Sequence, residues 1–274
     1  MSTMRKPILQ SILFAAVFTL LFMGLAFVKA MFPVLPERWM HAVMGTVAAV
    51  VTTVVFLRWQ GLRWSDIHLR MDRATPLRFG IGMALGLLVM GSLAFGVMRI
   101  AAVELVPNPD SSVGHFLLSS LYLLPLAYLE ELAFRGFPLE VLRGRTNTWL
   151  ALGLTSLLFA LYHVASGWSW ASAFYGPFIW GLIFGVAALQ YKGIAMPTGW
   201  HYAGNLATSA IGASANPQSI WLMQETPATE AAKSSIWITL GPVLVLLIIA
   251  VAWISVYQRR EGDGGRLQRS SSPA

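Results

Sequence analysis

Residues 115–142 read HFLLSSLYLLPLAYLEELAFRGFPLEVL, an apolar run that is interrupted in its middle by Glu130, Glu131 and Arg135. A helix of about 20 mostly apolar residues crosses the hydrocarbon core of a membrane, which is about 30 Å thick. Charged side chains at that depth are costly unless they are paired or hydrated. The stretch therefore predicts a transmembrane helix that carries a polar site near its middle.

The rest of the chain has the same character. Of its 274 residues, 56% are hydrophobic and 11% are charged, against roughly 25% charged residues in an ordinary soluble domain. Cysteine is absent, which excludes disulfide scaffolds and Cys-based zinc, haem or thiol chemistry. We predict an all-α, polytopic membrane protein with about eight transmembrane helices. Their approximate bounds are 8–31, 39–57, 78–103, 115–142, 148–166, 171–190, 194–213 and 235–257.

Lysine and arginine are distributed unevenly between the two sets of loops. Fourteen of them fall in the N-terminus, in the loops after the second, fourth and sixth predicted spans, and in the tail. The other side has four, namely Lys29, Arg38, Arg99 and Lys233. Because cytoplasmic loops are enriched in basic residues, we predict that both termini are cytoplasmic and that the number of spans is even. The net charge of +7 is then a topology signal, so we expect a lipid bilayer around the chain, as in a bacterial inner membrane, and no nucleic-acid partner.

The distribution of loops and spans suggests three parts. We expect N-terminal transmembrane helices with a basic cytoplasmic loop in 1–113, a catalytic core in 114–213, and an outer loop, a last transmembrane helix and a disordered cytoplasmic tail in 214–274. Pro125 and Pro138 are expected to kink or tilt the fourth span. Two pairs of glycines are each four residues apart, Gly82 with Gly86 and Gly181 with Gly185. Such pairs indicate close packing of helices.

The polar residues of the fourth span have a favourable helical spacing. Glu131 and Arg135 are four residues apart, with the acid N-terminal to the base, so they can pair on one face of the helix. This pairing leaves Glu130 about 100° further around the helix, where it is free to face a cavity. Because Glu130 then has no obvious partner on its own helix, we favour a functional role for it and a structural role for the pair.

Two later spans carry further polar residues. The fifth ends in Phe159-x-x-x-His163, and the seventh contains His201-x-x-x-Asn205. Taken alone, an intramembrane histidine can be a hydrogen-bonded packing residue, and an asparagine can form an interhelical hydrogen bond. Together with Glu130 they form a set on three helices that points toward a common centre. One glutamate and two histidines can hold a metal ion, or can activate water and stabilise an oxyanion.

These three motifs resemble those of the CPBP family, the CAAX proteases and bacteriocin-processing intramembrane proteases. The family includes type II CaaX prenyl endopeptidases and abortive-infection proteins, and the resemblance covers about residues 120–212. It implies an eight-helix fold with a conical cavity in the membrane. It further implies that Glu130 is the general base, that His163 assists it, that His201 and Asn205 stabilise the oxyanion, and that Glu131 and Arg135 support the site.

The resemblance leaves the cofactor open between none and zinc. A catalytic zinc takes three protein ligands and keeps an open position, and Glu130, His163 and His201 could supply them in a metalloprotease. Glu131 would then have to act as the base, in competition with its pairing to Arg135. The sequence lacks the His-Glu-x-x-His arrangement of many zinc proteases. We therefore favour water activation without a metal.

We predict an intramembrane endopeptidase, with a membrane-associated protein or peptide as its substrate. One alternative is a proton-coupled transporter, since buried Glu, Arg and His residues can form a proton relay, although no internal repeat supports it. Another is a non-catalytic membrane binding or immunity protein on the same scaffold. The sequence predicts neither the cleavage site, nor whether the substrate is prenylated, nor the oligomeric state.

Overall fold

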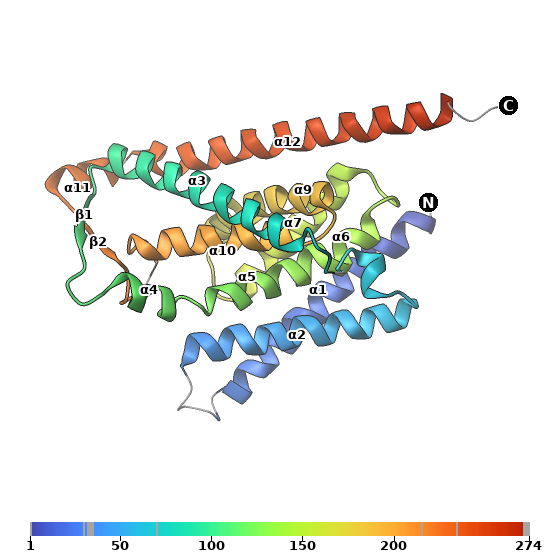
Figure 1. The fold of residues 1–274 in the computed structure, drawn as a ribbon, viewed down its shortest axis with the longest axis horizontal. Helices are drawn as coiled ribbons and strands as arrows, with labels where there is room; N and C mark the ends of the chain where they lie inside the picture. Colours follow the sequence, from blue (N-terminus) through green and yellow to red (C-terminus); the bar gives the residue numbers. More distant parts are fainter. Residues whose placement is uncertain are drawn as a thin grey trace.

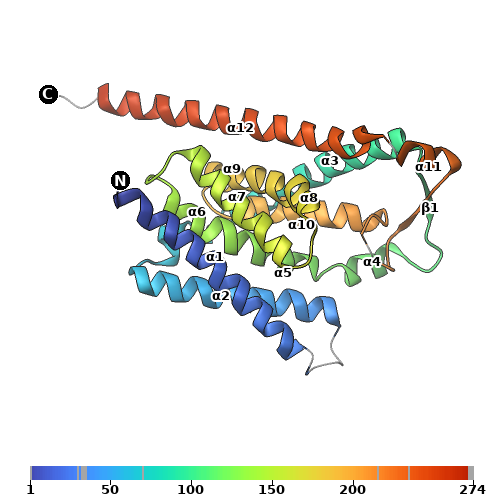
Figure 2. The same cartoon turned by 180° about the vertical axis from the view of Figure 1, so that it is seen from behind.

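The computed structural model is a bundle of long helices with one small sheet at the end remote from both chain termini (Figures 1 and 2). It describes residues 2–29, 31, 36–69, 71–214, 216–233 and 235–270. The helices before the fourth predicted span are α1 (Ser2–Lys29), α2 (Glu37–Gln60), the short 3-10 helix η1 (Trp64–Ile67) and α3 (Thr75–Ala101). The later unbroken helices are α7 (Thr148–Ala165), α10 (Ala195–Ala210), α11 (Pro227–Lys233) and α12 (Ile236–Ser270).

Within the described residues, seven helical segments are long and apolar enough to cross a membrane. They match seven of the eight predicted spans, so the predicted all-α membrane fold is confirmed. The remaining span, 194–213, forms α10, which has 16 residues and is therefore about 24 Å long. It ends early because Ile211 leaves the helix and Gly212 adopts a positive φ of 75°. The eighth predicted helix exists, but it is shorter than a full crossing.

Two of the spans are interrupted by π-helical turns. The fourth consists of α4 (Val113–Ser119), α5 (Leu123–Glu131), the π-turn η2 (Leu132–Gly136) and α6 (Phe137–Leu142). The sixth consists of α8 (Trp170–Ala173), the π-turn η3 (Phe174–Phe178) and α9 (Ile179–Tyr191). Pro138 lies in the first turn of α6 and Pro177 lies inside η3. A proline lacks the N–H that would continue the helical ladder, and each irregular turn contains a proline or is followed by one within two residues.

Small residues let α3 and α10 pack with their backbones in direct contact. A Cβ atom added at Gly82 would overlap the carbonyl oxygen of Met196, and one added at Gly199 would overlap that of Phe79. Gly86 is similarly close to Trp200. The second predicted glycine pair contacts α7, where Gly181 faces Ser156 and Gly185 faces Leu152. Both glycine pairs therefore lie at close helix contacts, as their spacing predicted. These contacts fix the positions of the helices around the centre of the bundle.

We expect Gly82→Ala to destabilise the protein by about 1–3 kcal/mol, the usual cost of overpacking a filled interior. The new methyl group would meet backbone that cannot rotate away. Gly80→Ala is the matched control, because it lies on the same helix and a Cβ there meets nothing within 4 Å. Thermal unfolding in detergent measures both variants. Equal unfolding temperatures for the two would contradict the close contact between α3 and α10.

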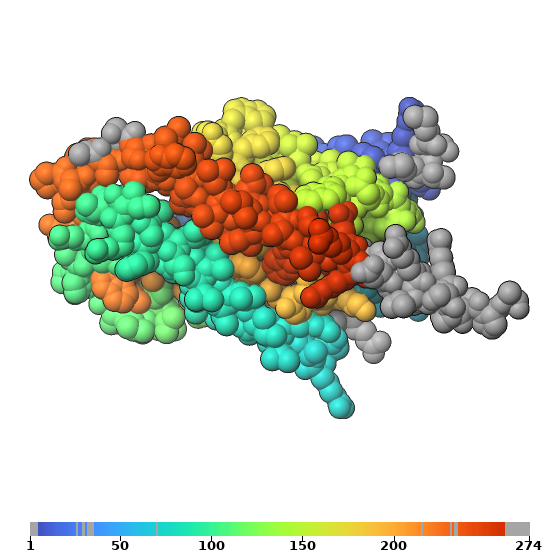
Figure 3. Space-filling model, turned by 90° about the horizontal axis from the view of Figure 1, so that it is seen from above, coloured from blue at the N-terminus to red at the C-terminus, as the bar shows by residue number. Residues whose placement is uncertain are grey.

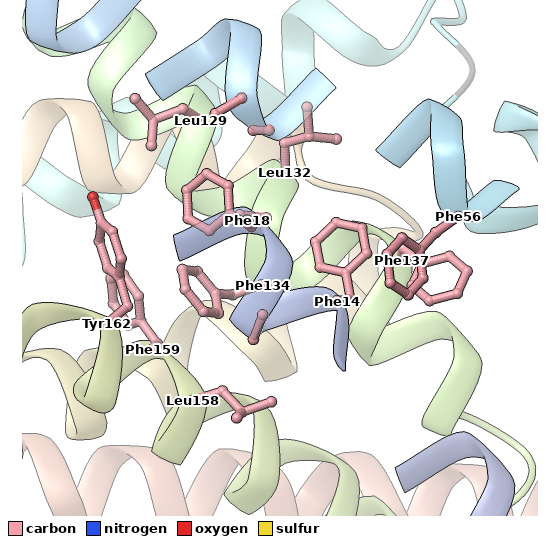
Figure 4. Packing of buried hydrophobic residues seen from close by; sticks show 14 of the residues in the cluster. Phe14, Phe18, Phe56, Leu129, Leu132, Phe134, Phe137, Leu158, Phe159 and Tyr162 are labelled. Carbon is pink, nitrogen blue, oxygen red and sulfur yellow. The ribbon is translucent and has the colours of Figure 1, made fainter. Parts of the chain in front are cut away.

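An aromatic core joins the first two helices to the centre of the bundle (Figure 4). Phe14 of α1 stacks on Phe137 of α6 with a centroid distance of 5.2 Å. Phe18 meets Phe134 of η2 edge-to-face at 5.8 Å. These side chains are fully buried, so the π-turn that follows Glu131 is held against α1 by packed rings.

The small sheet and the end of α12 depart from the prediction. β1 (Glu104–Pro107) pairs antiparallel with β2 (Trp221–Gln224), whereas only loops were predicted there. α12 lies along α3 across one face of the molecule (Figure 3). It continues to Ser270, so the tail that was predicted to be disordered is helical as far as that residue. Gln258, Arg259 and Arg260 have good helix propensity, which lets the helix run on past the apolar segment. The division of the chain at residues 113 and 213 stays a prediction.

Candidate active site

The six candidate residues lie on α5, η2, α7 and α10. Glu130 and Glu131 end α5, and Arg135 follows in η2. His163 lies in the last turn of α7. Four of the candidates, Glu130, His163, His201 and Asn205, line one cavity of about 510 Å³. The predicted common centre therefore exists in the structure.

Glu131 and Arg135 form the predicted ion pair, and both are buried. Arg135 Nη1 lies 3.4 Å from Glu131 Oε1, and neither side chain is exposed. The guanidinium carbon of Arg135 also lies 4.3 Å from the centre of the Phe159 ring. A cation over a desolvated aromatic face is attracted by the ring, so Phe159 and Glu131 together stabilise the buried charge of Arg135.

Glu131 has a second partner that the sequence did not reveal. His201 Nδ1 donates a hydrogen bond to Glu131 Oε1 at 2.9 Å, so the same carboxylate oxygen bridges Arg135 and His201. The interaction joins α5 to α10, which are distant in the chain, and no local spacing signals it. Glu131 therefore orients the ring of His201 as well as compensating the arginine.

His201 lies between the two adjacent carboxylates. Its Nε2 is 3.5 Å from Glu130 Oε2, on the opposite side of the ring from Glu131. The ring stacks on Phe184 of α9 with a centroid distance of 4.9 Å and an interplanar angle of 19°. This stacking partner was not predicted either. We expected Glu130 to have no partner on its own helix and to face a cavity. It does face the cavity, and its neighbour there is a histidine from another helix.

His163 has a defined tautomer. Its Nδ1 lies 2.9 Å from the carbonyl oxygen of Phe159, and since a carbonyl only accepts, the proton is on Nδ1. In the neutral ring, Nε2 is then an acceptor. Trp168 packs edge-on against the ring at 4.9 Å and lines the same cavity. The helix that carries His163 begins at Thr148 because the side chain of Asn147 accepts the N–H of Leu150.

Asn205 is one helical turn beyond His201 on α10 and lines the cavity beside it. Its side-chain amide makes no hydrogen bond with any residue that the structure describes, so both of its N–H groups are available to a bound molecule. The cavity is otherwise lined largely by apolar and aromatic side chains, among them Leu126, Trp180 and Phe184. The arrangement combines a carboxylate, two imidazoles and an amide in an apolar pocket.

The three side chains considered as zinc ligands, Glu130, His163 and His201, line the same cavity. Each histidine uses Nδ1 in a hydrogen bond, His201 to Glu131 Oε1 and His163 to the carbonyl oxygen of Phe159, and this arrangement leaves Nε2 as the atom that can meet a bound group. Among the residues that the structure describes, no three His, Asp or Glu side chains are grouped closely enough to hold a metal ion. Water activation without a metal stays a prediction.

Comparison with known proteins identifies the segment that contains the site. Residues 111–207 match the family described as type II CAAX prenyl endopeptidase Rce1-like, and all six candidate residues lie within the match. No curated protein matches the chain. The match agrees with the resemblance predicted from the three motifs: residues 111–207 of this multi-pass membrane protein are similar to the Rce1-like family, and this similarity supports a CAAX-type intramembrane protease in general terms.

Proposed function

We propose that this chain hydrolyses a peptide bond of a membrane-associated protein or peptide, with Glu130 as the base that activates water. One observation carries the proposal. Glu130, His163, His201 and Asn205 come from three different helices and line a single apolar cavity. A carboxylate in such a cavity can take a proton from a water molecule within hydrogen-bond reach.

The positions of the two histidines support different roles. His163 presents an accepting Nε2, since its Nδ1 carries the proton, so it can orient the attacking water together with Glu130. His201 can donate from Nε2 only when both of its nitrogens are protonated. Glu131 and Glu130 flank such an imidazolium at 2.9 and 3.5 Å, and charge-assisted hydrogen bonds of this kind are the strong ones.

Hydrolysis would then proceed in two proton transfers. Glu130 accepts a proton as the water oxygen attacks the peptide carbonyl carbon, and the carbonyl oxygen becomes an oxyanion. His201 Nε2 and the amide of Asn205 donate to that oxyanion, the type of stabilisation that contributes most in acyl transfer. When the C–N bond breaks, Glu130 returns the proton to the leaving amine. Glu131 and Arg135 touch no reacting atom and act as positioning residues for His201.

The test compares the membrane-bound and released peptides of cells that make the chain with those of cells that make the Glu130→Ala variant. We expect at least one cleaved species that depends on Glu130. Glu104→Ala is the control, because this glutamate is exposed in β1 and lies outside the cavity. If the two variants give the same peptides as the unaltered chain, while inserting normally into the membrane, the hydrolase proposal fails.

We expect peptide cleavage to survive removal of metal ions, because the proposed base and oxyanion donors are all side chains. The measurement is the cleavage rate in detergent before and after exhaustive chelation, together with the metal content of the same sample. Two results together would overturn this expectation. The cleavage rate would fall by more than about tenfold on chelation, which corresponds to an activation barrier raised by about 1.4 kcal/mol, and it would return when zinc is added.

A further inference from the structure

The cavity occupies one half of every span that lines it. On α10 its lining begins at Trp200, continues through Asn205 and Thr208, and ends at Ser214, beyond the end of the helix. In the fourth span it runs from Glu130 back to Tyr122, which precedes α5. All of these segments lead from the centre of the bundle toward the end where the sheet lies (Figure 1).

The other end of the bundle closes the cavity. Glu131 and Arg135 follow Glu130 toward that end, and both are buried with relative exposures of 0% and 1%. A second cavity of about 650 Å³ lies there, lined among others by Tyr128, Lys192 and Thr198, and it shares no lining residue with the first. The candidate active site therefore has its mouth at the sheet end.

Charge distinguishes the two ends. The closed end carries basic residues in α1, in the α2–α3 loop, in the α6–α7 loop and in the α9–α10 turn, including Arg5, Arg63, Arg143, Arg145 and Lys192. Both the start of α1 and the end of α12 lie at this end (Figure 2).

The mouth end has the opposite character. Its described segments carry four basic residues, Lys29, Arg38, Arg99 and Lys233, beside five carboxylates, namely Glu37, Glu104, Asp110, Glu225 and Glu230. Basic loops stay on the cytoplasmic side of a membrane, so the closed end faces the cytoplasm.

Exposed tryptophans mark the level of both membrane surfaces. At the closed end they are Trp59, Trp64 and Trp149, and at the mouth end they are Trp39, Trp168, Trp170, Trp221 and Trp237. Tryptophan is enriched where a membrane protein meets the lipid headgroups. Trp168 belongs to the second group and also lines the cavity, so the mouth of the cavity lies at the headgroup level rather than deep in the bilayer.

We infer that the cavity opens to the extracytoplasmic side of the membrane and receives the outer juxtamembrane end of an apolar, membrane-anchored segment. The orientation follows from the charge and tryptophan distribution, whereas the identification of this segment as a substrate rests on the proposed hydrolysis. Met90, Leu126 and Trp180 give the cavity apolar walls that suit apolar side chains next to the scissile bond. The substrates are then proteins or peptides that are exported or inserted with this segment outside.

The absence of native cysteine permits a direct test. Ser214→Cys places a thiol at the exposed mouth, and Ser65→Cys places one in the α2–α3 loop at the basic end, where the serine is also exposed. Each variant is treated with a membrane-impermeant maleimide in right-side-out and in inverted vesicles. We expect Ser214→Cys to react in right-side-out vesicles and Ser65→Cys in inverted ones. The reverse pattern, or a Ser214→Cys thiol that reacts in neither preparation, would overturn the orientation.

A second measurement addresses the substrate. Two reporters carry the same apolar segment and the same flanking peptide, which lies outside the membrane in one and inside in the other. We expect Glu130-dependent cleavage of the outer reporter alone. Cleavage of the inner reporter would refute the inference while supporting hydrolysis. A third outcome is that the thiols are labelled as expected but neither reporter is cleaved. This outcome would refute the substrate assignment and count against the proposed function, whereas the inferred orientation would stand.

Discussion

Replacing Glu130 by glutamine is expected to lower the cleavage rate of an identified substrate by about 10²–10⁴-fold, the usual contribution of a positioned general base. Glutamine has nearly the same shape and can still occupy the cavity wall beside His201, where the carboxylate now lies 3.5 Å from Nε2. It cannot accept a proton from water. The loss should therefore appear in kcat, with a smaller change in KM, because the substrate still reaches the cavity.

The variant must be compared with one that removes a carboxylate elsewhere. Glu104→Gln does so on the exposed strand β1 and is expected to retain full activity. Thermal unfolding of both proteins in detergent separates a chemical defect from a folding defect. If the Glu130→Gln protein cleaves at the normal rate, Glu130 is not the general base. The same variant would then be measured in a proton-transport assay, which tests the alternative function of a proton relay.

The parts of the site that follow from local spacing could be predicted from the sequence. Glu131 and Arg135 are four residues apart on one helix, so their ion pair depends on helical geometry alone. The glycine pair at Gly82 and Gly86 likewise predicted a close helix contact, which the structure shows between α3 and α10. In each case one helix and its period are enough to decide which side chains meet.

The parts that depend on packing between distant elements could not be predicted. The hydrogen bond from His201 to Glu131 requires α10 to lie at a particular depth beside α5, and that depth is set by tertiary contacts. The pairing of β1 with β2 joins two four-residue segments that are too short to show a periodic pattern. The early end of α10 depends on a glycine turn, whereas hydropathy continues beyond it. Hydropathy and helical spacing carry none of this information.

Replacing Arg135 by methionine is expected to destabilise the protein by about 3–5 kcal/mol, the usual cost of leaving one member of a buried ion pair without its partner. Glu131 is completely buried and would keep only His201 as a partner. Methionine fills a similar volume, so the loss would reflect charge rather than a cavity. Arg78→Met is the control, since Arg78 pairs with an exposed Asp72 at 3.0 Å, and such surface pairs contribute only about 0–1 kcal/mol.

The double variant Arg135→Met with Glu131→Gln separates charge compensation from the orientation of His201. Removing both charges should recover most of the lost stability, because the completely buried Glu131 carboxylate is then no longer left without its cation. The amide oxygen of the new glutamine can still accept from His201 Nδ1, so the ring keeps its direction but loses the negative charge beside it. Stability without activity is therefore the expected result. If the double variant were as unstable as Arg135→Met alone, the arginine would act through packing on Phe159 rather than through the charge of Glu131.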